Sequence, residues 1–243
     1  MRIFLSTALA AALLAASASA SSIDADFNGV SPKKPVQIQN DGFETWTWAG
    51  YGNFSINSRN NDGNHSDFLT AMNNDFGGYC IDLKQGIYRG NTGTWTLSEL
   101  DSAPTPGPAM GLDRAKQLAW LFDYLEGVKS AEFQLAVWEI VNEDSGTFDL
   151  ANGTFRASHL SQYDSSQPVG WFAALNSLDP ATLPMPENIL ALTSDTMQDF
   201  AVSVDFPPPP PPEVIPEPIT LLCMLAAGGS LAGYIRKRRS AGA

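Results

Sequence analysis

The sequence predicts an α+β fold in which short antiparallel strands pack with a helical hairpin, followed by a polyproline spacer and a C-terminal membrane helix. Three observations predict it. Several segments alternate apolar and polar residues between turn-forming residues, which is typical of strands. Residues 112–125 and 131–141 have apolar side chains at helical spacing. Six consecutive prolines, 207–212, precede an apolar run that ends in basic residues. We therefore divide the chain into segments 1–20, 21–206, 207–215 and 216–243.

Residues 1–20 have the features of a signal peptide. Arg2 supplies a positive start, residues 3–16 are apolar, and Ala18-Ser19-Ala20 forms a small-residue cleavage site. A membrane-spanning helix is a poor alternative because the apolar run is short and rich in alanine. We expect the protein to be exported.

Composition restricts the partners and cofactors of the exported part. The chain has 26 acidic and 14 basic residues and a net charge of −12, which argues against a basic face for nucleic acid. The polar run 58–67 has a weak likeness to a calcium loop, but Ser58 stands at the first ligand position and Leu69 at that of the bidentate glutamate. We expect a solvated turn there, with neither a metal nor a cofactor in the protein.

The strands are predicted from alternation and from glycine. Residues 21–35 have no periodicity and read as an extended leader. Gly77 and Gly78 enter the segment that holds Tyr79 and Cys80, and glycine there permits the close approach of another backbone. The other predicted strands are 45–49, 54–57, 94–97, 189–192 and 200–204.

The helices are predicted from an apolar stripe and from capping residues. Residues 112–125 carry a broad stripe, and Ser130 is a suitable N-cap for the helix that follows. The two helices are expected to form a hairpin, and residues 168–178 a third helix. Glu139, Glu143 and Asp144 would need a pocket to act as an acid/base pair, so we expect them on a solvated face.

One cysteine and one glutamine are unusual for their surroundings. Cys80 is the only cysteine of the predicted domain, because Cys223 lies in the apolar tail, so no intramolecular disulfide is available to it. Gln134 lies among apolar helix residues, and burying its amide is costly unless the amide finds hydrogen-bond partners.

The segments Tyr79-Cys80-Ile81 and Gln134-Leu135-Ala136-Val137-Trp138 resemble the two motifs of the thioester domains of bacterial surface adhesins. The chain departs from that pattern at Phe133, where the family usually has threonine. The resemblance implies a covalent Cys80–Gln134 thioester that reacts once with an amine or hydroxyl of a surface partner. Tyr79, Phe133 and Trp138 are the aromatic neighbours suited to shielding it, and ordinary core packing is their other role.

The C-terminal tail resembles the PEP-CTERM sorting signal of Gram-negative, often biofilm-forming bacteria. It has Pro216-Glu217-Pro218, an apolar span at 219–235 and the basic residues Arg236, Lys237, Arg238 and Arg239, in that order. The polyproline run before it forms a semi-rigid spacer of roughly 3 Å per residue. The resemblance implies transient anchoring in the inner membrane, cleavage by an exosortase, and release to the cell surface or exopolysaccharide matrix.

Two function classes remain open for residues 21–206. The first is a covalent adhesin that uses the thioester and is not an enzyme, because it turns over once. The second is a non-covalent module that binds carbohydrate or the matrix, with Cys80 as a small buried residue and Gln134 hydrogen-bonded to backbone. In that class the exposed tryptophans and tyrosines stack on sugars. A hydrolase is unsupported, because the chain has neither a Gly-x-Ser-x-Gly nor a His-Glu-x-x-His motif.

Overall fold

Helices and antiparallel strands together make up the part of the chain that the computed structural model describes, which is residues 20–125, 128–185 and 187–205. The mixed fold class predicted from the sequence is therefore confirmed at this level. The strands are β1 (Ser22–Asn40), β2 (Phe43–Asn60), β3 (Asp75–Cys80), β4 (Thr92–Ser98), β5 (Phe155–Ser158), β6 (Ile189–Thr193) and β7 (Phe200–Ser203).

The helices follow the predicted pattern closely. They are α1 (Ser66–Ala71), α2 (Gly111–Tyr124), α3 (Ala131–Asn142) and α4 (Ser166–Leu175), with short 3-10 turns at Leu100–Ser102, Leu160–Gln162 and Pro180–Thr182. Ser130 is the N-cap of α3, as predicted, and its side chain accepts the backbone N–H of Phe133. The helix α1 is not among the predicted elements: its first two residues belong to the run 58–67 expected to be a solvated turn, and the other four follow that run.

The sheet closes on itself. Its strand order is β2-β3-β7-β6-β4-β1-β5, and β1 also pairs with β2, so six of these strands form a ring. Every pairing among the described strands is antiparallel. The seventh strand, β5, extends the sheet beside the second half of β1.

The expectation of an extended leader at residues 21–35 is wrong. This segment is the first part of β1, which with β2 forms a long ribbon, so the sheet does not consist only of short strands. Ile23, Ala25 and Phe27 are buried inside the ring. Ile23, Ala25 and Phe27 alternate with Asp24 and Asp26, so a strand period is present at the start of this segment. Register shifts after Phe27 interrupt it further along β1.

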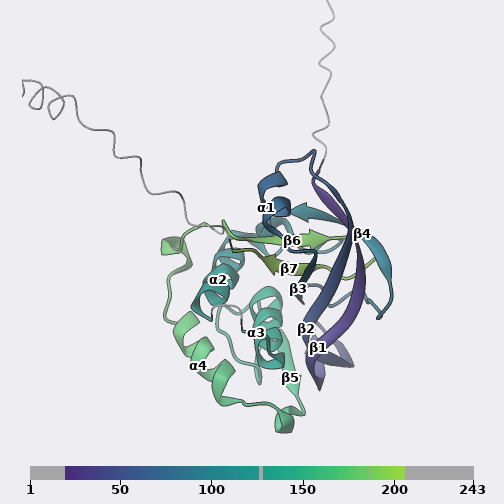
Figure 1. Cartoon of the computed structure of the whole chain (residues 1–243). Coiled ribbons are helices and arrows are strands. Elements are labelled where there is room, and N and C mark those ends of the chain that lie inside the picture. The colour runs from purple at the N-terminus through teal and green to yellow at the C-terminus, as the bar shows by residue number, and fades with distance from the viewer. Residues whose placement is uncertain (1–19, 126–127, 186, 206–243) are drawn as a thin grey trace, which may run out of the picture. The chain divides into compact units, whose positions relative to one another are not determined.

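Two layers of core result. One fills the ring and continues beneath the start of α3, and the other lies between the sheet and the helices. Figure 1 shows α2, α3 and α4 gathered on one side of β3, β6 and β7. The helix α2 runs antiparallel to α3, because the Arg114 guanidinium donates to the Val141 carbonyl at 2.9 Å while Phe122 contacts Phe133 at the other end. The predicted helical hairpin is therefore present.

Other sequence predictions lie outside the described residues. These are the signal peptide at 1–20 except for its last residue, the spacer at 207–215, and the sorting signal at 216–243 with its span at 219–235. Within the described ranges, no helix is both long enough and apolar enough to cross a membrane.

Candidate functional site

Gln134 and Cys80 contact each other through two hydrogen bonds. The Cys80 backbone N–H donates to Oε1 of Gln134 at 2.9 Å, and Nε2 of Gln134 donates to the Cys80 carbonyl oxygen at 2.8 Å. Both residues are buried: Cys80 is 5% exposed and Gln134 is 1% exposed. One side-chain amide thus satisfies both backbone polar groups of one strand residue.

The strand register explains why Cys80 needs such a partner. The strand β2 pairs with β3 only from Asp75 to Gly78, although on its other edge β2 goes on pairing with β1, where Gly50 is opposite Lys33. The other edge of β3 continues to pair with β7 through Cys80. The Gln134 amide therefore occupies the place that the next residue pair of β2 would have filled. A buried backbone group left unpaired there would be costly.

The Cys80 thiol lies in a buried polar contact of its own. It donates to the Asp82 carbonyl oxygen at 3.0 Å, and the indole Nε1 of Trp138 donates to its sulfur at 3.4 Å. Burial raises the pKa of the Cys80 thiol to about 12, and the nearby Asp82 and Asp199 add to the rise. A free thiol at this position stays protonated at neutral pH and reacts slowly while the protein is folded.

The three predicted shielding residues lie in different places. Trp138 contacts the sulfur directly, as just described. Tyr79 and Phe133 belong to the other core layer, and their rings pack at a centroid distance of 4.5 Å. The Tyr79 hydroxyl donates to the Val128 carbonyl at 2.6 Å and accepts the Ser130 N–H at 3.0 Å, so it fixes the start of α3 against β3. Of the three residues, Trp138 is the one in contact with the sulfur, and Tyr79 and Phe133 join β3 to the start of α3.

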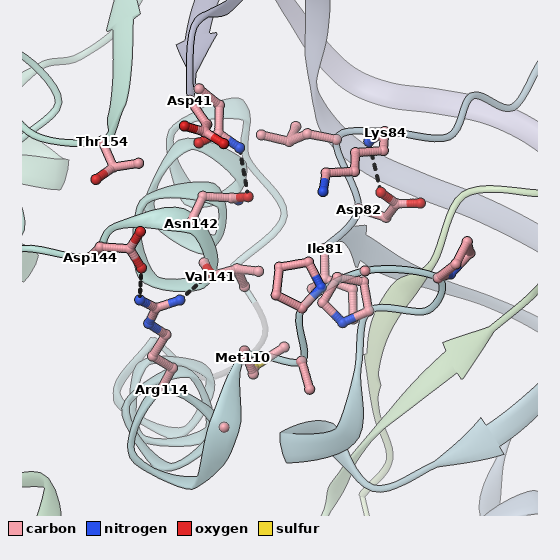
Figure 2. A pocket seen from close by; sticks show the side chains of 18 of the residues that line it. Asp41, Ile81, Asp82, Lys84, Met110, Arg114, Val141, Asn142, Asp144 and Thr154 are labelled. Carbon is pink, nitrogen blue, oxygen red and sulfur yellow. Dashed lines mark hydrogen bonds and ion pairs between the residues drawn. The ribbon is translucent and has the colours of Figure 1, made fainter.

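A cleft of about 680 Å³ lies beside the pair. Neither Cys80 nor Gln134 lines it, but the residues that follow Cys80 do. Figure 2 shows Asp82 and Lys84 on one wall and Arg114, Asn142 and Asp144 on the opposite wall. Arg114 pairs with Asp144 at 2.5 Å on that opposite wall. The Asp82 carbonyl that accepts the Cys80 thiol belongs to a residue of this cleft, and a second cleft of about 670 Å³ is lined by Tyr79 and Phe133.

Two buried carboxyl groups near Cys80 were not found from the sequence. Asp82 is 2% exposed, and its Oδ1 accepts the Lys84 N–H at 2.7 Å while its Oδ2 has no hydrogen-bond partner. Asp199 is fully buried and accepts the N–H groups of Thr105 and Ser194. Burial raises the pKa of Asp82, and burial raises that of Asp199 to about 7. Neither aspartate belongs to a recognisable motif: Asp82 lies two residues after Cys80, and Asp199 lies immediately before Phe200.

The prediction that Glu139 and Glu143 lie on a solvated face is wrong. They are 0% and 2% exposed. Glu143 accepts backbone N–H groups of Ser145 and Thr154, and Glu139 accepts that of Asp149. The loop after α3 folds back over both carboxylates, and they hold it in place. Only Asp144 is exposed as expected.

Metal-ligand geometry is not found among the described residues, in which no group of three or more His, Cys, Asp or Glu side chains could hold an ion. Comparison with protein families, with curated proteins and with solved structures finds no match for this chain.

Proposed function

We propose that this is an exported surface or matrix protein that stores an internal thioester between Cys80 and Gln134 and uses it once to bond covalently to a partner. The observation that carries the proposal is the pairing of the Gln134 amide with the backbone of Cys80. The partner supplies an amine or a hydroxyl, on a protein or a polysaccharide. Because the bond is not regenerated, the protein is not an enzyme.

The chemistry balances without a further reactant. The Cys80 sulfur adds to the Gln134 side-chain carbonyl carbon, and the amide nitrogen leaves as ammonia with the thiol proton. A partner amine or hydroxyl later adds to the same carbon, and the sulfur leaves and regains a proton. The products are an amide or ester bond at Gln134 and a free Cys80 thiol.

The orientation of the two groups supports this reaction. Two hydrogen bonds to Cys80 hold the Gln134 amide close to the plane of the sheet. The Cβ of a strand residue stands out of that plane, and Sγ, which contacts Asp82 and Trp138, must rotate about χ1 of Cys80 to approach the face of the amide. Nucleophiles add to a carbonyl from that face. Holding both groups in this way supplies the proximity that the reaction requires.

Burial supports storage of the product. A thioester hydrolyses in water, and this site is closed by Trp138 and by the two core layers. A partner nucleophile must therefore displace part of the wall. We infer that it enters from the cleft bounded by Ile81 and Asp82, which immediately follow Cys80.

Intact mass tests the thioester. The Cys223→Ser variant leaves Cys80 as the only cysteine. Purified from its exported form, it should weigh one ammonia less than its sequence and resist alkylation even after denaturation. Methylamine should add to Gln134 and free one thiol. Cys80→Ala and Gln134→Ala in the same background should abolish these effects.

The denatured-state measurement is essential because a buried thiol with a raised pKa also resists alkylation in the folded protein. Full sequence mass, together with stoichiometric alkylation after denaturation, would exclude the thioester. Cys80 and Gln134 would then be a purely structural pair, as in the non-covalent alternative.

We also propose that the tail directs sorting, because the motif, the apolar span and the basic cluster occur together. An exosortase-type enzyme cleaves near Pro216-Glu217-Pro218, and the protein passes from the inner membrane to the cell surface or matrix. Replacing Glu217 and deleting residues 236–239 should each trap unprocessed protein in the inner membrane. Normal release of both variants would contradict this.

A further inference from the structure

The outer face of the β1–β2–β5 sheet carries two exposed tryptophans. Trp46 and Trp48 are 57% and 52% exposed and lie on the same face of β2, because side chains two residues apart share a face. Their spacing along the strand is about 7 Å. They face away from the core that Val36 and Ile38 of β1 enter.

Polar side chains surround the two rings. Across the strands, Trp46 is opposite Gln37, which in turn is opposite Ser158 of β5. Glu44 is opposite Gln39 and accepts a hydrogen bond from the Gln37 amide at 2.5 Å. The remaining neighbours on this face are Lys33, Pro35, Arg156 and His159.

Each ring is supported on one side. The Lys33 ammonium lies 4.4 Å from the centroid of the Trp48 ring. The His159 ring lies 4.7 Å from Trp46, and His159 has a left-handed backbone conformation, which is uncommon for a residue other than glycine. These contacts limit the motion of the rings before any ligand arrives, which lowers the entropy cost of binding.

We propose that this outer face, defined by Trp46, Trp48, Gln37, Glu44 and Ser158, binds a neutral polysaccharide. The two indole rings stack on the C–H faces of sugar rings in one polysaccharide chain. The amide, carboxylate and hydroxyl groups beside them form hydrogen bonds with sugar hydroxyls. Pro35, the aliphatic residue of this face, is partly buried, and the face has no cluster of one charge. The proposal does not depend on the thioester.

Size and charge argue against other occupants. The exposed parts of the two tryptophans amount to roughly 250 Å², about a third of the ~800 Å² that each partner usually contributes to a stable protein complex, and the rest of the face is polar. The net charge of −12 disfavours anionic polysaccharides, nucleic acid and anionic membranes. A neutral glycan needs only a narrow strip of surface.

Affinity electrophoresis of the whole exported protein tests the site. The gels contain hydroxyethylcellulose, laminarin or galactomannan as neutral probes and alginate as an anionic one. At least one neutral gel should retard the protein. Trp46→Ala and Trp48→Ala should each weaken binding about tenfold, and the double variant should abolish it.

Phe43→Ala is the matched control. Phe43 is 53% exposed on the same hairpin but lies one residue out of phase with the tryptophans, so its loss should leave retardation unchanged. The circular dichroism of all variants should match the parent protein. Retardation in none of the neutral gels, retardation by alginate alone, or neutral binding that the double variant retains would each overturn the proposal. If the parent protein sediments as a dimer and the double variant as a monomer, the face binds a second copy of the chain instead of a glycan.

Discussion

Two glutamates of α3 lie two turns apart in contrasting environments. Glu132 and Glu139 are 4% and 0% exposed. Burial alone would raise the pKa of Glu132, but the Lys34 ammonium at 2.5 Å and the Asp164 N–H outweigh it, so that pKa lies below its ordinary value. Glu139 has one N–H donor and an unpartnered Oε2, and burial raises its pKa to about 8.

The comparison shows that hydrogen-bond and ion-pair partners, more than burial, decide the protonation state of a carboxyl group on α3. Gln134 lies between the two glutamates and is also buried, yet the backbone of Cys80 satisfies it without charge. The helix thus carries a paired charge, a paired neutral amide and a carboxyl group that is favoured in its neutral form. Three changes test this ordering.

The largest effect is expected from Gln134→Ala. To separate the hydrogen bonds from any thioester, the change is made in a Cys80→Ala background. Two buried backbone groups of residue 80 lose their partners and a cavity opens, so the free energy of unfolding should fall by about 3 kcal/mol. Urea denaturation of the single and double variants measures it. A loss below about 1 kcal/mol would mean that water or a neighbouring strand replaces the amide.

A smaller effect is expected from Lys34→Met, which leaves Glu132 buried without its counterion. Lys34 is itself partly exposed, so we expect a loss of about 2 kcal/mol at pH 7. The loss should shrink as the pH falls through the pKa of Glu132, because the protonated carboxyl needs no cation. Lys33→Met is the control, since Lys33 lies on the outer face over Trp48. Equal losses in both variants would contradict the pairing.

An effect that is small at acid pH and grows as the pH rises is expected from Glu139→Gln. With a folded pKa near 8 and an unfolded value near 4.5, Glu139 holds a proton in the folded state that the unfolded chain has lost. Its contribution to stability is therefore present at acid pH and is lost as the pH rises from about 4.5 to 8, at no more than about 1.4 kcal/mol per pH unit. Glutamine should remove this slope and stabilise the protein at pH 8. Thermal unfolding across this range measures it.

Glu143→Gln is the matched control for that change. Both Glu143 oxygens accept backbone N–H groups, so an amide NH₂ would oppose one of these donors. This variant should be destabilised at every pH. If Glu139→Gln and Glu143→Gln change the stability equally at each pH, the two carboxyl groups do not differ in their hydrogen bonding.

Local sequence determined the elements with a continuous period and a clear boundary. The helix α3 followed from Ser130 and its apolar spacing, and α2 from its stripe. The strands β4, β6 and β7 followed from short alternating runs. The contact between Cys80 and Gln134 was indicated by a motif resemblance and by the need of a buried amide for partners. The helices and strands depend on residues close together in the chain, whereas the Cys80–Gln134 contact joins residues 54 positions apart.

Only the tertiary structure decided the full length of β1 and the burial of Glu139 and Glu143. The alternation of Ile23, Ala25 and Phe27 with aspartates could have marked the start of β1, but register shifts between Phe27 and Lys33 hide that one strand continues to Asn40. The glutamates are buried by the loop that follows α3, whose N–H groups they accept. That loop contains Gly153, which has a φ of 106° and leaves no room for a side chain beside Glu143. The cost of burying a carboxyl group depends on donors that only the folded backbone brings to it.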